Sequence, residues 1–143
     1  MVQVDGRVEF NCPAAAVYRQ LARGVQGHTV GSALADEELD RPVTVLTRYA
    51  TVLWFGTVRT TEEASLDPGR SITWRHVEGP LTGSRETFTV VPHGEGALVE
   101  YRGNIRARHP LFRGPLERLF VAPMTRSVSL RALRDARDQL ERT

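Results

Sequence analysis

The order of the hydrophobic patterns along the chain constrains its fold more than any other feature. Residues 2–10 alternate between apolar and polar side chains, which is typical of a half-buried strand. Residues 13–23 have the period of a short amphipathic helix, and residues 115–142 have that of a long one, which Pro123 should kink or split. The stretch between them, from residue 36 to 106, has the pattern of successive strands.

Six strands are predicted after the first helix, at 32–40, 43–54, 57–66, 70–77, 82–91 and 96–106. Each break contains Gly or Pro and is too short for a crossover helix, so neighbouring strands should be antiparallel. Residues 25–35 fit either a second short helix or a loop. The pattern therefore predicts an α+β fold. A curved antiparallel sheet of about seven strands wraps around a long C-terminal helix, with one or two short helices after the first strand.

Length and composition narrow the class of protein. A chain of 143 residues with 41% hydrophobic and 25% charged residues favours one folded domain, residues 1–143. All 19 basic residues are arginine, and the absence of lysine excludes Schiff-base chemistry. Cys12 is the only cysteine, so no internal disulfide forms. The chain has no apolar run of membrane-spanning length and no signal-peptide pattern at its start, so the expected location is cytoplasmic.

Several short motifs recur in the order and spacing of a known superfamily. They are a strand leading into Pro13–Tyr18, a Pro-x-Arg strand start at Asp67–Trp74, the turn Gly79–Leu81, a hairpin over Phe88–Val99, and the helix end Leu130–Asp135. In this order the chain resembles the START-like/polyketide cyclase superfamily, which has the helix-grip or birch-pollen-allergen-like fold. The resemblance implies a cavity between sheet and helix that binds a hydrophobic or aromatic small molecule. Members include polyketide cyclases, lipid and hormone carriers and quinone-binding proteins, so the fold does not settle the function.

Strand parity selects the side chains that would face this cavity, because successive side chains point to opposite faces of a sheet. A hairpin centred near Gly79 would place Trp74 opposite Ser84 and Ile72 opposite Glu86. Such a face mixes aromatic rings with a few polar groups, as small-molecule pockets do. The predicted lining residues from the sheet are Trp54, Ile72, Trp74, Ser84, Phe88, Val99 and Ile105. The terminal helix is predicted to supply a lid of Leu116, Phe120 and Met124.

Three residues on this face are candidates for catalysis. Glu86 lies on an otherwise apolar parity and is a candidate general base; the alternative is a solvent-facing position at a bulge. His76 is a candidate acid/base group beside it, or an exposed residue near a strand end. Tyr101 is a candidate donor to a ligand carbonyl, or a core residue with its hydroxyl at the rim.

The sequence leaves three functions open. The first is a non-catalytic protein that binds a lipid, quinone or polyketide-like molecule, and it demands the least of unproven residues. The second is a polyketide cyclase or dehydratase that uses the acid/base groups of the same cavity. The third is a protein- or RNA-interaction module that uses the basic cluster Arg102, Arg106, Arg108 and Arg113, although no aromatic residues are interleaved with it and nucleic-acid binding is not expected.

The sequence predicts no cofactor and no metal site, because the four histidines lack the spacing of metal ligands. The expected partner is therefore a hydrophobic or aromatic small molecule. The oligomeric state stays open, with a homodimer among the alternatives.

Overall fold

Six strands form a single antiparallel sheet in the computed structural model, which describes residues 1–26, 40–53, 56–110 and 113–142. The spatial order is β1-β6-β5-β4-β3-β2. The strands are β1 Val2–Phe10, β2 Val43–Leu53, β3 Gly56–Asp67, β4 Ser71–Glu78, β5 Arg85–His93 and β6 Gly96–Ile105. The helices are α1 Ala14–Gln26, a single π-helical turn η3 Glu117–Val121, and α2 Ala122–Glu141.

The predicted α+β architecture is confirmed, with small differences at the element level. The described residues contain six strands rather than about seven, and almost all of the strand expected at 32–40 lies outside them. The first helix continues past Gly24 to Gln26. The C-terminal helix is not split at Pro123: helical backbone continues from the π-helical turn η3 into α2, and Pro123 lies in the first turn of α2.

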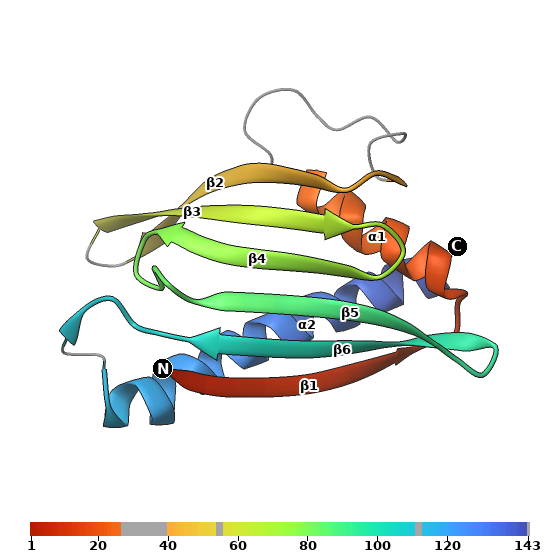
Figure 1. Ribbon diagram of the computed structural model, residues 1–143. Coiled ribbons are helices and arrows are strands. Elements are labelled where there is room, and N and C mark those ends of the chain that lie inside the picture. The colour runs from red at the N-terminus through yellow and green to blue at the C-terminus, as the bar shows by residue number, and fades with distance from the viewer. Residues whose placement is uncertain (27–39, 54–55, 111–112, 143) are drawn as a thin grey trace.

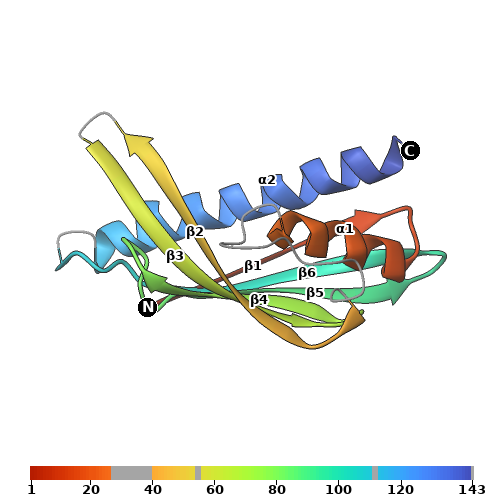
Figure 2. The same ribbon diagram turned by 90° about the horizontal axis from the view of Figure 1, so that it is seen from above.

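The first strand lies beside the last. Val2 pairs with Ile105 and Phe10 with Ala97, so β1 and β2 stand at opposite edges of the sheet. Consequently, the chain crosses from one edge to the other between β1 and β2, and α1 is part of that crossing. Both helices lie on the same face of the sheet (Figure 1), and the view from above shows α1 beneath one end of α2 (Figure 2).

The predicted register of the β4–β5 hairpin is wrong by two residues. Trp74 pairs with Glu86 and Ile72 with Phe88, because the hairpin is centred on Pro80 rather than Gly79. The connecting turn is closed by a hydrogen bond from the Thr82 backbone N–H to the Gly79 carbonyl, 3.3 Å. A shift of two residues keeps every side chain on its predicted face but changes its neighbour.

The core fills the space between the two helices and strands β1, β3, β4, β5 and β6. It contains apolar side chains from all of these elements, including Phe10, Val17, Ile72, Val99 and Leu133, which are almost completely buried. Burial of each such side chain contributes about 1.5–3 kcal/mol. No helix in the described ranges is long and apolar enough to cross a membrane.

Close packing between α2 and β1 depends on one glycine. A Cβ atom on Gly6 would lie 2.8 Å from Leu130 Cδ2, so any side chain there would push the helix away from the strand. Two residues nearer the start of α2 are packed differently: Met124 and Val128 are 63% and 65% exposed. These two side chains line a hollow between α2 and the sheet.

Candidate functional site

A cavity lies between the curved sheet and the first half of α2. It consists of a larger hollow of about 870 Å³ and an adjoining one of about 420 Å³. The two hollows share five wall residues, Tyr49, Glu62, Trp74, Phe88 and Ala132. Volumes of this size are typical of small-molecule sites.

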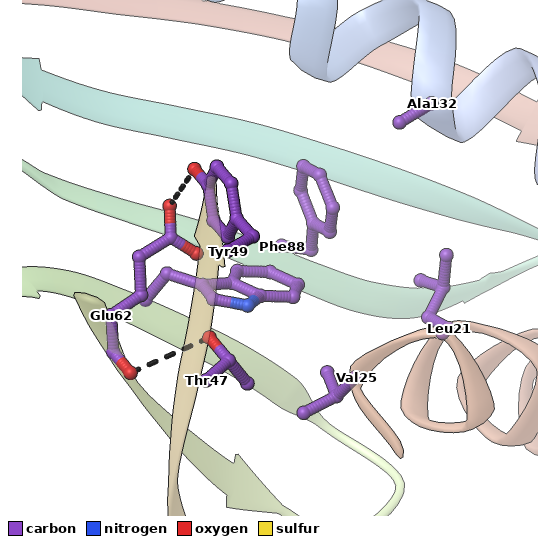
Figure 3. Close-up of a pocket in the computed structure, with 9 residues that line it drawn as sticks. Leu21, Val25, Thr47, Tyr49, Glu62, Phe88 and Ala132 are labelled. Atoms are coloured by element: carbon purple, nitrogen blue, oxygen red, sulfur yellow. Dashed lines mark hydrogen bonds between the residues drawn. The ribbon is translucent and has the colours of Figure 1, made fainter. Parts of the chain in front are cut away.

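The smaller hollow is apolar on its helical side. Leu21 and Val25 from α1 and Ala132 from α2 face Phe88 of β5, while Tyr49 and Glu62 stand on the far side (Figure 3). Trp74 meets Phe88 edge to face, with ring centroids 5.0 Å apart. Such an aromatic wall suits a flat apolar or aromatic molecule.

Glu86 is the centre of a buried polar cluster at the wall of the larger hollow. Its Oε1 accepts hydrogen bonds from the Tyr101 hydroxyl at 2.5 Å and from the Ser129 hydroxyl at 2.9 Å. Its Oε2 lies 3.4 Å from His76 Nε2. The carboxylate thus joins β4, β5 and β6 to helix α2.

Two features of the sheet create this convergence. Because β4 and β5 are centred on Pro80, Glu86 lies opposite Trp74 and diagonal to His76 on the same face. Glu86 also pairs with Gly103 of β6. A Cβ atom on Gly103 would lie 2.8 Å from the Tyr101 hydroxyl, so this glycine leaves the space through which Tyr101 reaches Glu86.

A second carboxylate extends the cluster toward β2. Glu62 Oε1 lies 3.4 Å from His76 Nδ1, without the geometry of a hydrogen bond, and accepts a hydrogen bond from the Tyr49 hydroxyl at 2.9 Å. Its Oε2 accepts none of the hydrogen bonds made by the described residues. A β-bulge between β3 and β4, where the pairing shifts at Thr61 and Glu62, lies at this point. Bulges commonly redirect side chains beside sites.

The electrostatics favour an ionised cluster. Burial raises the pKa of Glu86, but hydrogen bonds from His76, Tyr101 and Ser129 outweigh it and leave the pKa lowered. Burial likewise lowers the pKa of His76, yet its hydrogen bond to Glu86 and the charges of both carboxylates leave that pKa raised. Burial first, and then the Glu86 carboxylate, raises the pKa of Tyr101. Glu86 is therefore a weaker base than an ordinary glutamate, and His76 holds its proton more tightly than an ordinary histidine.

The residues predicted as catalytic, Glu86, His76 and Tyr101, are brought together. Glu86 and His76 line the larger hollow, and the fully buried Tyr101 joins them through its hydroxyl. His76 is not an exposed strand-end residue: only 4% of it is accessible.

The residues predicted as ligand-binding divide into four groups. Trp74, Phe88 and Met124 line the cavity. Ile72, Ser84, Val99 and Ile105 are completely buried and do not line it, and Ser84 instead exchanges hydrogen bonds with the backbone of Arg106. Leu116 and Phe120 lie on the segment before α2 without lining the cavity, and Phe120 is 64% exposed. The π-helical turn changes the helical phase assumed for the lid. Trp54 lies outside the described residues.

Sequence reasoning missed several wall residues, above all Tyr49, Glu62 and Ser129. Glu62 carries the same signal that identified Glu86, a carboxylate on the parity of buried Ala64 and Leu66. Ser129 lies one helical turn before Leu133, on the buried side of α2. The helical spacing of Ser129 and the strand parity of Glu62 could therefore have identified both as cavity residues from the sequence.

One arginine of the predicted basic cluster, Arg113, hydrogen-bonds through its side chain to the backbone of the protein. Arg113 donates to the backbone carbonyls of Ala107 and Arg108, at 3.0 Å each, and braces the segment after β6. Among the described residues, no cluster of three or more His, Cys, Asp or Glu side chains is arranged to hold a metal ion.

The chain belongs to the family described as polyketide cyclase/dehydrase and lipid transport, whose pattern matches residues 1–143. This membership agrees with the resemblance carried by the sequence motifs. A comparison with curated proteins finds no match.

Solved structures with the same fold come from varied proteins. The Zhui aromatase/cyclase from Streptomyces sp. R1128 is 16% identical, with a TM-score of 0.69 over 99% of this chain and 94% of that one. A START superfamily protein from Mycobacterium smegmatis is 17% identical, with a TM-score of 0.66 over 96% and 98%. A major latex protein family member from Arabidopsis thaliana is 13% identical, with a TM-score of 0.58 over 99% and 95%. At these identities the likeness establishes the fold alone.

Proposed function

We propose that this protein binds a small apolar or aromatic molecule carrying one polar end in the cavity between the sheet and α2. The observation that carries the proposal is the division of the cavity wall. Leu21, Val25, Trp74 and Phe88 offer an apolar end, and the cluster around Glu86 and Glu62 offers a polar end. An apolar lining with a few convergent polar groups binds and orients such ligands.

Membership of a family that includes lipid transport supports a binding role. The cavity also lies beside exposed apolar residues of α2, Met124 and Val128, which form part of its wall. A ligand bound there would cover these side chains and remove apolar surface from water, at roughly 25 cal/mol per Å².

Filling the cavity tests the proposal. Ala132 lines both hollows, so Ala132→Phe should occupy part of the volume and weaken binding of a hydrophobic fluorescent dye at least about tenfold, or 1.4 kcal/mol. Ser127→Phe adds the same ring at an exposed position of α2 that does not line the cavity. Native mass spectrometry of the purified protein would also reveal a retained ligand. Equal dye binding by wild type and Ala132→Phe would contradict the proposal.

A second candidate function is acid–base catalysis in the same cavity, as in a cyclase or dehydratase. The observation that favours it is the convergence of His76, Glu86 and Tyr101 within hydrogen-bonding distance. With Glu86 holding it in place, the His76 imidazolium would act as the acid. Glu62, whose Oε2 remains open, would act as the base.

The chemistry expected of this pair is loss of water from a β-hydroxy ketone. The Glu62 carboxylate takes the proton next to the carbonyl, and the carbon–oxygen bond of the hydroxyl breaks. His76 gives its proton to the departing oxygen, and an enone and water result. The adduct of naphthaldehyde and acetone is a suitable probe, because the enone product absorbs strongly. Turnover should be lost in His76→Ala and Glu62→Gln but kept in Glu63→Gln. If the wild-type protein dehydrates the probe no faster than buffer does, catalysis is contradicted and the binding function is the only one that remains.

A further inference from the structure

The charged groups lining the cavity are unusual for a chain so rich in arginine. All 19 basic residues of the sequence are arginine, yet none of the described residues that line either hollow is one. The ionisable side chains there are the carboxylates of Glu62 and Glu86, the hydroxyl of Tyr49, and the imidazoles of His76 and His109.

Strand parity explains where the arginines go. Arg59, Arg75 and Arg85 lie on the polar parity of β3, β4 and β5 and are exposed on the outer face. Arg126 of α2 is directed to β1, where its Nε donates to the Asp5 carbonyl at 2.5 Å. An anionic ligand in the cavity would therefore find no guanidinium among the described wall residues.

The two carboxylates differ in how many of their oxygens accept hydrogen bonds from the protein. Both oxygens of Glu86 already have partners in His76, Tyr101 and Ser129. Glu62 has the Tyr49 hydroxyl and the nearby His76 ring at Oε1, while Oε2 accepts none of the described hydrogen bonds. Two carboxylates face a single imidazole, so even a protonated His76 would balance only one of the two negative charges. His109 also lines the larger hollow, at an exposed position.

Glu62 lines both hollows beside Trp74 and Phe88, and its Oε2 accepts none of the described hydrogen bonds. A carboxylate removed from bulk water is stabilised by a cation or a hydrogen-bond donor, and a second anion beside it is strongly disfavoured. This electrostatic preference selects among ligands that the apolar wall would otherwise accept equally.

We propose that the cavity selects aromatic or apolar molecules that end in a cationic amine or a hydroxyl donor, that Glu62 Oε2 receives this donor, and that carboxylate-bearing molecules such as fatty acids are excluded. This inference rests on the proposed binding function and names the chemical class of its ligand. It also makes Glu62, which has no role in the packing of the core, the residue that determines specificity.

Three naphthalene probes that differ only in the polar end test the selection. They are naphthylmethylamine, naphthalenemethanol and naphthoate, with binding to the purified protein measured by calorimetry at pH 7. The amine should bind at least about tenfold more tightly than naphthoate, and the alcohol should fall between them.

Matched variants assign the effect to one carboxylate. Glu62→Gln should bring the ratio of amine to naphthoate affinity close to one, while affinity for naphthalenemethanol changes little because the amide oxygen still accepts a hydrogen bond from the hydroxyl. Glu63→Gln removes the same charge from the next residue of β3, whose carboxylate pairs with Arg75 on the outer face, and should leave the ratio unchanged. Unchanged alcohol binding by Glu62→Gln would also establish that the variant is folded.

The outcomes separate the two proposals. If naphthoate binds wild type as tightly as the amine, or if Glu62→Gln preserves the preference, the inference is overturned and the binding function stands. If none of the probes nor a hydrophobic dye binds wild type, the proposed function fails, and the inference fails with it.

Discussion

The two halves of α2 lie against opposite environments. In the second half, Leu133 is completely buried, and Ala136 and Leu140 pack against the core. In the first half, Met124 and Val128 are mostly exposed at the wall of a cavity. One continuous helix thus serves as core at one end and as the side of a binding site at the other.

This contrast shows how a small domain can keep a cavity and remain folded. The close-packed end supplies the apolar burial that offsets the cost of ordering the chain. The hollow end is held by polar contacts instead, through the Glu86 cluster that bridges three strands and α2. Substitutions in the two regions should therefore differ in both size and character.

The largest expected effect is in the core half. Leu133→Ala should lower the free energy of unfolding by about 2–5 kcal/mol, because the side chain is fully buried and leaves a void. Val128→Ala, on the cavity half of the same helix, should change it by no more than about 0.5 kcal/mol. Urea denaturation measures both, and similar losses for the two variants would contradict the division of α2.

A smaller effect is expected at Gly103, between the two regions. Gly103→Ala should cost about 1–3 kcal/mol, because the new methyl group would collide with the Tyr101 hydroxyl and displace it from Glu86. In a Tyr101→Phe background the same substitution should cost less, and thermal unfolding of the four proteins measures the coupling. Gly24→Ala, where a Cβ meets nothing within 4 Å, is the matched control and should be neutral or stabilising.

Ser129→Ala should have a more modest effect, about 1 kcal/mol, because Glu86 Oε1 keeps the Tyr101 hydrogen bond when it loses the one from Ser129. Ser127→Ala, two residues earlier on the exposed side of α2, should change stability by less than about 0.5 kcal/mol. Chemical denaturation at neutral pH compares the two serines. An equally small loss of stability in Ser129→Ala would mean that the hydrogen bond from Ser129 to Glu86 does not stabilise the fold.

The smallest expected effect depends on pH, because burial opposes the influence of the charged partners. The lowered pKa of Glu86 gives stability that is present above its unfolded value of 4.5 and is lost as the pH falls through the folded pKa. The raised pKa of His76 gives stability that is present below its unfolded value of 6.5 and is lost as the pH rises through the folded pKa. Both contributions are therefore complete between about pH 4.5 and 6.5.

Replacing the histidine isolates its part of this profile. In His76→Phe the decline in stability above about pH 6.5 should disappear, apart from titration of other groups. Thermal unfolding from pH 4 to pH 9 for wild type and variant measures the difference between the two curves. Parallel curves throughout that range would mean that the pKa of His76 does not change on folding.

Local patterns were sufficient for most of the fold. The alternation in residues 2–10 and the Gly- and Pro-containing breaks predicted the strands closely, because side-chain parity and turn chemistry are properties of neighbouring residues. Pro123 also lies close to the point where the π-helical turn η3 gives way to α2. Parity alone also selected Glu86, His76 and Tyr101 as residues on one face.

Register and helix phase could not be obtained in this way. A hairpin centre displaced by one residue moved Glu86 from opposite Ile72 to opposite Trp74. A π-helical turn before α2 left Phe120 exposed rather than over the cavity. Both features depend on how the turn and the helix pack against distant strands.

The sequence by itself determined which side chains of the strands face inward, because that depends only on the two-residue period of a strand. The tertiary structure alone decided which of them touch. Gly103 had to lie beside Glu86 to admit the Tyr101 hydroxyl, and α2 had to cross the sheet where Ser129 could reach the same carboxylate. These contacts join residues as far apart as 43 positions, and their geometry is set by the curvature of the sheet and the packing of one helix across it.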